Sequence, residues 1–287
     1  MRRFKELIMQ GVFFVAALAS VFAVLLICIF LFANGIPAIR EIGIFDFLLG
    51  KKWSPLDTPA SYGIFPMILG SIYVTAGAII IGVPLGLLTA IFLAKFCPKW
   101  LYKILKPSCD LLAGIPSVVY GFFGLVVLVP LVRNVFGGKG SSIFTASILL
   151  GIMILPTIIA VSESAINAVP ESYYEGAIAL GATHERSVYT AVVPAAKSGI
   201  LAGVVLGIGR SIGETMAVVM VAGNQPRMPN GLFRGVRTLT TNIIMEMGYA
   251  AELHREALIA TGVVLFVFIL LINLLFSVIK RRSNNVL

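Results

Sequence analysis

Six long apolar runs decide what this chain can fold into. A membrane-spanning helix needs about 20 mostly apolar residues, because the hydrocarbon layer is about 30 Å thick. Only 12% of the residues are charged, against about 25% in soluble domains. We therefore expect an all-α polytopic membrane protein with six transmembrane helices, in the runs 11–33, 66–94, 111–132, 143–161, 192–222 and 257–279.

The first run follows a basic start and in this respect resembles a secretory signal. Its apolar part is longer than the roughly 7–15 residues of a signal core, and it matches the length of a spanning helix. We therefore expect an uncleaved first helix. The three cysteines, one of them inside this run, argue against a disulfide framework.

The net charge of +9 fits a membrane topology better than a nucleic-acid partner, because no basic patch with interleaved aromatic residues is present. Cytoplasmic segments of membrane proteins carry an excess of Lys and Arg. The short loop after the third run has only Arg133 and Lys139, whereas the two ends and the linker after the second run are strongly basic. Both termini are therefore expected in the cytoplasm, beside the cations Arg2, Arg3, Lys5, Lys95, Lys99, Lys103, Lys106, Lys280, Arg281 and Arg282.

The polar segment between the fourth and fifth runs predicts a short helix from Pro170 to Gly181. Proline and glutamate suit a first helical turn, and glycine suits the stop. A helix of this length is far too short to span a bilayer. We interpret it as a contact surface for another protein; the alternative is an amphipathic helix that lies on the membrane.

The fifth run carries Arg210 and Glu214, which are four residues apart and so are expected on one helix face. A charge at bilayer depth costs about 2.5–3.5 kcal/mol on insertion scales and usually faces a cavity or a partner. Our hypothesis is that Arg210 attracts a transported anion and that Glu214 moderates the attraction. The alternative is a salt bridge that only fixes helix packing. Hydroxyls of Ser117, Ser211 and Thr215 are candidate further donors, unless they satisfy local backbone carbonyls.

Other patterns argue against chemistry in this chain. The stretch 137–142 looks like a phosphate-binding loop, but it lacks Gly-Lys-Ser/Thr in register and does not lie between a strand and a helix. His184 and His254 have no partners at metal spacing, and we interpret both as loop residues. We expect no catalytic residue, no metal site and no nucleotide site. In the long loop 223–256, apolar residues at helical spacing predict a short helix against the bundle, as a gate or a docking face.

The order Glu175-Gly176-Ala177, then Gly181, then Pro194 resembles the Glu-Ala-Ala loop of ABC importer permeases, with Gly176 where alanine is usual. In that family the loop forms coupling helices that sit in a cleft of the cytoplasmic ATPase, which implies ATPase coupling for these five residues. The resemblance covers about residues 66–279 and implies a type I ABC importer permease (MetI-like) fold. By this resemblance, residues 1–65 form an N-terminal transmembrane helix plus an extracytoplasmic loop. Residues 66–280 form the ABC transmembrane type-1 permease domain, which contains the coupling loop 162–194.

Further motifs are similar to the phosphate-specific ABC transporter permeases of the PstC/PstA family. Residues 209–217 resemble the fifth-helix signature, and residues 113–121 the third-helix motif. Residues 52–55, followed by 62–66 and Gly70, resemble the outer loop and second-helix entry of the PstC-like members.

The resemblance implies a permease subunit, not an enzyme, that imports inorganic phosphate by alternating access across the bacterial cytoplasmic (inner) membrane. In this scheme the motion of the loop around Glu175 is transmitted by a rigid fifth helix to Arg210. The implied partners are a PstA-like second permease, a PstB-like ATPase dimer that binds ATP and Mg, and an extracytoplasmic PstS-like phosphate-binding protein. No cofactor is expected in the chain itself. The alternatives are a molybdate or sulfate permease, an ion-coupled secondary carrier, which would need repeated halves, and a non-transporting scaffold.

Overall fold

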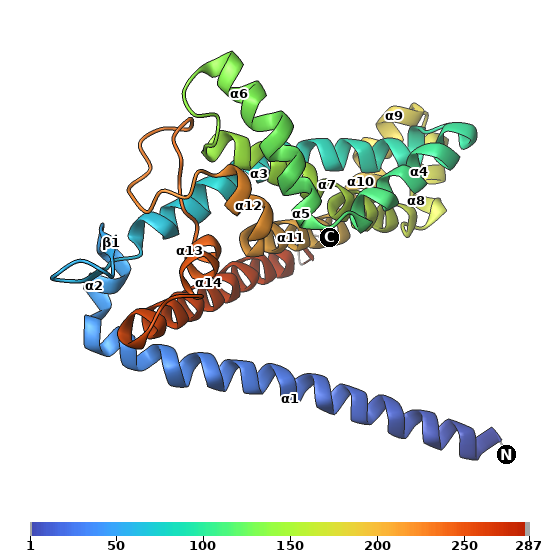
Figure 1. Cartoon of the computed structure of the whole chain (residues 1–287). Coiled ribbons are helices and arrows are strands. Elements are labelled where there is room, and N and C mark those ends of the chain that lie inside the picture. The colour runs from blue at the N-terminus through green and yellow to red at the C-terminus, as the bar shows by residue number, and fades with distance from the viewer. Residues whose placement is uncertain (1, 285–287) are drawn as a thin grey trace.

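The first helix, α1 (Arg2–Ile42), stands apart from the rest of the bundle (Figure 1). Only its later part packs on α14 (Glu252–Asn284), where Gly35 lies against Ala260 and Val263. None of its most apolar window is buried, so this surface is available to lipid or to another subunit. The computed structural model describes residues 2–284, without the side chains of residues 2–5, 7–8 and 279–284. The basic residues near the two termini, from which we predicted a cytoplasmic location, therefore lie outside the described side chains: Arg2, Arg3, Lys5, Lys280, Arg281 and Arg282.

Within residues 2–284, five helical segments are long and apolar enough to cross a membrane, and there are six if one bent pair counts as a single span. This agrees with the six predicted spans. The bent pair joins residues 184–195 to α11 (Lys197–Gly213) at an angle of 70°. After α11 the chain breaks again before the short α12 (Met216–Val221). The expectation of one rigid fifth helix is therefore wrong, because the span is bent near Ala196 and interrupted at Glu214 and Thr215.

The centre of the bundle is built from α3 (Phe65–Ile91), α7 (Ile143–Asn167) and α11. Glycines let these helices approach closely. A Cβ on Gly82 would lie 2.7 Å from the side chain of Ile154, and a Cβ on Gly199 would lie 2.4 Å from that of Ala165. Gly199, Gly203 and Gly207 thus form a ridge along the part of α11 that faces α7.

The third run divides between two helices, because Pro116 separates them. Residues 111–114 belong to α4 (Lys99–Gly114), and the span itself runs from α5 (Ser117–Phe123) through the π-helix η2 (Gly124–Leu128) to α6 (Val129–Phe136). α4 buries none of its side chains. It is tied to α7 through Glu163, whose carboxylate accepts hydrogen bonds from Tyr102 at 2.7 Å and faces Lys106 at 2.9 Å. The bond to Glu163 raises the pKa of Tyr102.

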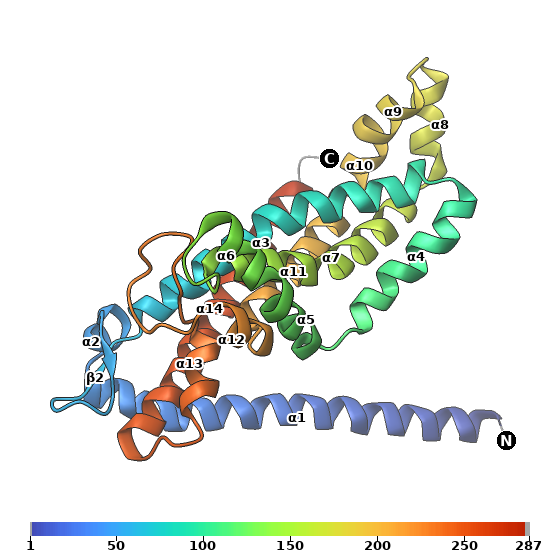
Figure 2. The same ribbon diagram turned by 45° about the horizontal axis from the view of Figure 1, so that its top comes forward.

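The remaining elements lie at the two ends of the bundle (Figure 2). At one end are the π-helix η1 (Phe92–Phe96), α8 (Glu171–Ala179), α9 (His184–Ser187), the π-helix η3 (Val188–Val192) and α10 (Val193–Ala195). At the other end are α2 (Ile44–Leu49), the antiparallel hairpin of β1 (Trp53–Ser54) and β2 (Ser61–Tyr62), and α13 (Leu239–Glu246). The helix predicted in the loop 223–256 is confirmed as α13, which packs on α3 and α14.

Candidate transport path and coupling loop

The predicted contact helix is present as α8, and its end is set by Gly181. The glycine has φ +83°, a conformation that side chains rarely adopt. Its N–H donates to the carbonyl of Ile178, and the N–H of Ala182 donates to that of Ala177, which closes the last turn. α8 has no buried residue, and the neighbouring Leu180 is 91% exposed. An apolar tip of this kind is suited to a protein contact.

The coupling residues named from the sequence lie on this tip and at its root. Glu175 and Gly176 are exposed on α8, Ala177 is half-buried there, and Gly181 is exposed at its end. Pro194 is exposed and lies in α10, just before the bend at Ala196. Along the chain, α8 is joined to α11 through α9, η3, α10 and the bend, and on its other side it follows directly on α7, which packs on α11.

His184 fastens this loop to the body of the bundle, a role that the sequence did not predict. Its Nδ1 lies 2.8 Å from the hydroxyl of Tyr174 on α8, and its Nε2 lies 3.2 Å from the backbone carbonyl of Lys95. The ring also packs edge-on against Phe96 at 4.9 Å. The interpretation of His184 as a simple loop residue is wrong, because it begins α9 and links α8 to the end of the second span.

The break in the fifth span separates the two charges that were expected on one helix face. Arg210 lies in the last turn of α11, whereas Glu214 is the first residue beyond that helix, with extended backbone angles. Both side chains are half-buried. Among the described residues no ion pair joins them. The salt-bridge alternative therefore does not describe this conformation.

Each charge instead lies beside the end of a helix of opposite partial charge. Arg210 is near the carboxyl end of α11, where a cation is favourable. The Oε1 atom of Glu214 accepts a hydrogen bond of 3.2 Å from the N–H of Ala217 in the first turn of α12. The carboxylate therefore serves as a cap for the helix that follows the break.

The three candidate hydroxyls differ in their surroundings. Thr215 donates to the carbonyl of Gly213 at 3.1 Å, which is the local backbone role that was the alternative. The buried hydroxyl of Ser211 has no hydrogen-bond partner among the described residues. Ser117 is half-buried at the start of α5, the helix that packs against α12. The structure thus brings the break and the start of α5 into one region.

Two glycines beside Arg210 face open space. A Cβ on Gly209 or Gly213 would meet no atom within 4 Å, unlike one on Gly199, Gly203 or Gly207. Packing inside this chain therefore does not explain them.

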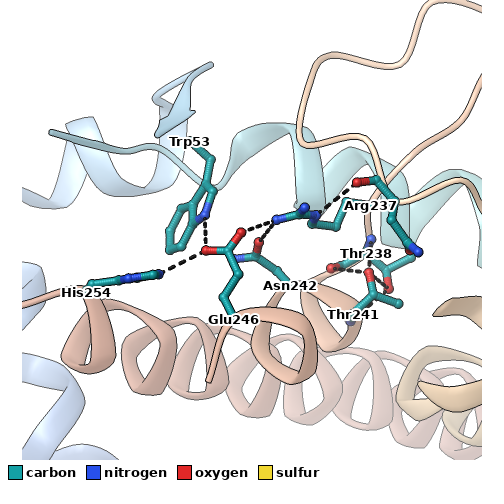
Figure 3. Close-up of polar contacts among 8 residues, drawn as sticks. Trp53, Arg237, Thr238, Thr241, Asn242, Glu246 and His254 are labelled. Carbon is teal, nitrogen blue, oxygen red and sulfur yellow. Dashed lines mark hydrogen bonds and ion pairs between the residues drawn. The ribbon is translucent and has the colours of Figure 1, made fainter. Parts of the chain in front are cut away.

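A buried polar cluster at the opposite end of the bundle was missed from the sequence (Figure 3). Glu246, at the end of α13, accepts hydrogen bonds from Nε1 of Trp53 at 2.8 Å and lies 2.9 Å from Nε2 of His254. Its other oxygen pairs with Arg237, which also donates to Asn242 at 3.0 Å. The interpretation of His254 as a loop residue is wrong, since it is 7% exposed and lies in the first turn of α14.

No simple pattern in the sequence announces this cluster. Its members come from β1, the segment before α13, α13 and α14, and Trp53 and Glu246 are separated by 193 positions. Arg237, Glu246 and His254 are titratable residues in a chain with few charges, and this was the signal that could have marked a polar cluster. Which residues they pair with depends on the fold.

The chain matches the family model "Binding-protein-dependent transport system inner membrane component" over residues 82–285. It is 41% identical over 270 residues to the "Probable ABC transporter permease protein YqgH" of Bacillus subtilis, a match that covers 91% of this chain and 87% of the relative. It is 35% identical over 267 residues to the "Phosphate transport system permease protein PstC" of Mesorhizobium japonicum, covering 86% and 81%.

Two solved structures show the same fold. An inward-facing MetNI methionine ABC transporter matches with a TM-score of 0.63 and 19% identity, over 77% of this chain and 95% of that one. A bacterial alginate ABC transporter in complex with a periplasmic protein matches with a TM-score of 0.66 and 17% identity, over 98% of both chains. The chain therefore has the MetI-like architecture that the sequence motifs implied.

Proposed function

The chain belongs to the family of binding-protein-dependent transport system inner membrane components, and from this premise we propose that it is the permease subunit of an ATP-driven importer of inorganic phosphate. The observation that carries the proposal is its similarity to phosphate permeases named PstC, which reaches 35% identity over most of the chain. Further support comes from Arg210, a cation within a spanning segment that pairs with no described carboxylate.

In the proposed mechanism, Arg210 provides a waypoint for the anion at the break in the fifth span. Phosphate carries negative charge near neutral pH, and a guanidinium binds it without losing its own proton. Glu214 stands four positions away and repels the anion, so that the anion is released as well as admitted. Ser211 and Ser117 offer hydroxyl donors nearby, and Thr215 does so if it leaves the carbonyl of Gly213.

The tip formed by α8 is proposed as the dock for a separate ATPase. Leu180 and Tyr173 are exposed there, and the family resemblance assigns the loop to ATPase coupling. We infer that nucleotide-driven closure of an ATPase dimer moves α8, and that the bend at Ala196 converts this movement into a change at the break beside Arg210. Because the fifth span is bent near Ala196, the angle between residues 184–195 and α11 can change when α8 moves.

The full assembly is proposed to contain a homologous PstA-like permease, a PstB-like ATPase dimer that binds ATP and Mg, and a PstS-like phosphate-binding protein. Gly209 and Gly213, which face open space, are suited to lie along the path or against the second permease. The proposed orientation places both termini and α8 in the cytoplasm of a bacterial cell, and the hairpin and α13 outside.

The test is uptake of labelled phosphate, sulfate and molybdate by the complete complex in proteoliposomes, with and without ATP inside. We expect ATP-dependent uptake of phosphate. Arg210→Gln should lower it by about tenfold or more, because a charge-assisted contact is lost, while the complex still assembles. Arg227→Gln is the matched control, since this arginine is exposed and its side chain donates a hydrogen bond of 2.5 Å to Gln225. Uptake of another oxyanion alone, uptake without ATP, or full activity of Arg210→Gln would contradict the proposal.

A further inference from the structure

The break in the fifth span is supported by α13, a helix from a distant part of the chain. The break leaves the backbone carbonyl of Glu214 outside the hydrogen-bond ladder of α11. The hydroxyl of Thr240, in the first turn of α13, donates to this carbonyl at 3.1 Å. Thr240 is 7% exposed, so no solvent bond readily replaces this contact.

α13 is fixed at its beginning by two sets of bonds. Thr238 and Thr241 form a reciprocal capping box. The N–H of Leu239 donates to the hydroxyl of Ser71 on α3 at 3.0 Å. These contacts hold Thr240 between the second span and the break.

α13 is fixed at its other end by the carboxylate of Glu246 (Figure 3). This carboxylate forms hydrogen bonds or ion pairs with Trp53 of the hairpin, Arg237 of the segment before α13, and His254 of α14. The guanidinium of Arg237 also donates to the backbone carbonyl of Asn224 at 3.2 Å, which ties in the chain that follows α12. The hairpin, the segment before α13 and the start of α14 therefore meet at Glu246.

We propose that Glu246 is a positioning residue for transport: through α13 and Thr240 it fixes the backbone of Glu214 at the break, and so sets the opening that the anion meets beside Arg210. The inference rests on the proposed function. Its physical basis is the burial of Arg237, which is 8% exposed and has no other carboxylate within salt-bridge distance among the described residues. Without the charge of Glu246, α13 has to shift so that the guanidinium reaches water.

The experiment measures phosphate uptake and ATP hydrolysis together in the reconstituted complex. Glu246→Gln should lower the uptake per ATP hydrolysed by about tenfold or more, as expected when a buried charge loses its partner. Thr240→Val keeps the side-chain shape and Glu246 itself, and should lower the same ratio by about fivefold, the equivalent of one hydrogen bond. Asp57→Asn is the control, because it breaks an exposed ion pair on the same hairpin that carries Trp53.

Hydrogen exchange by mass spectrometry provides a readout that does not depend on the substrate. In Glu246→Gln and in Thr240→Val, exchange should rise at residues 214–217 as well as in α13, and it should not rise there in Asp57→Asn. A role limited to folding would lower uptake and ATP hydrolysis in parallel with the amount of assembled complex; that result, or an unchanged ratio in Thr240→Val, would overturn the proposal. If the wild-type complex carries no phosphate, the proposed substrate fails, and the exchange at 214–217 still decides the positioning role.

Discussion

The two short helices at opposite ends of the bundle, α8 and α13, are similar in length and opposite in construction. α8 has nine residues, no side-chain cap at its start and no buried side chain. α13 has eight residues, a capping box and buried side chains along its length. α13 is therefore packed within its own chain, whereas α8 leaves an exposed surface, which fits the contact with an ATPase that we propose.

The two helices also differ in how they are anchored. α8 is anchored by the ring of His184, which lies beside Tyr174 and the backbone carbonyl of Lys95, and by packing on η3 and α9. α13 is connected through a buried carboxylate with three partners, together with Ser71 and Thr240. A segment with few anchors moves at low cost in free energy, and a segment with many anchors is held in place. This difference fits the proposed mechanism, in which the end that carries α8 is moved by the ATPase (the driven end) and the end that carries α13 stays in place (the fixed end).

The largest predicted effect falls on the fixed end. Arg237→Gln leaves the carboxylate of Glu246 buried without its arginine, which should cost about 3–5 kcal/mol in the free energy of opening α13. Hydrogen exchange over residues 239–246 measures this cost. Arg234→Gln is the matched control, since Arg234 is exposed on the same segment. If the amides of α13 were equally protected from exchange in the two variants, the buried ion pair would not hold α13, and the difference in anchoring between α8 and α13 would be lost.

A smaller effect is predicted for the turn that ends α8. Gly181→Ala should destabilise the loop by about 1–2 kcal/mol, because an L-residue is strained at positive φ. Gly176→Ala should stabilise α8 by about 0.5–1 kcal/mol, since alanine is the better helix former. Both positions have open space around an added Cβ, so they differ only in backbone conformation. The stability of the loop in exchange measurements, and its capture of the ATPase, should change in opposite directions in the two variants.

The hydrogen bond between Tyr174 and His184 is predicted to contribute less to the stability of the loop than the turn at Gly181 does. Tyr174→Phe removes the hydroxyl that lies 2.8 Å from His184, and one such bond contributes about 1 kcal/mol. Exchange in residues 171–187 should rise by a few-fold. Tyr173→Phe provides the comparison, because that neighbouring side chain is 53% exposed. A similar rise in both variants would show that His184 does not anchor the loop.

The smallest effect concerns the exposed ion pair of the hairpin, where Lys52 lies 2.8 Å from Asp57. The hydrogen bond from Lys52 lowers the pKa of Asp57 from its ordinary value of 3.8. A lowered pKa in the folded state means that the stabilisation is present above pH 3.8 and is lost as the pH falls through the folded-state value. Asp57→Asn should therefore change the melting temperature slightly at neutral pH and not at all below that range. A large change at neutral pH would contradict the view that exposed pairs contribute little.

Much of the end that carries α8 could be predicted from the sequence, because its signals are local. Pro170, Glu171 and Gly181 set the bounds of α8 through backbone preferences that act within one turn. The six spans followed from the length of the apolar runs. The break at Glu214 is not predicted in this way, since we interpret the glycines at 209 and 213 as positions inside one continuous helix, although Gly213 is the residue at which α11 ends.

The residues around the break show the same limit. The spacing of Arg210 and Glu214 predicts a shared helix face only if the helix continues. It ends at Gly213, so the two side chains serve different helices. The backbone carbonyl of Glu214, which the break leaves outside α11, is satisfied by Thr240 in the first turn of α13, 26 positions further along the chain.

The sequence by itself determined that this chain is a membrane protein, how many times it crosses, and where the short exposed helix α8 begins and ends. These properties depend on hydrophobicity and backbone preference, which are local. Only the tertiary structure decided that the fifth span is bent and broken, and that Glu246 gathers Trp53, Arg237 and His254 into one buried cluster. The physical reason is that a buried charge needs partners in space, and the chain supplies them from wherever folding brings them together.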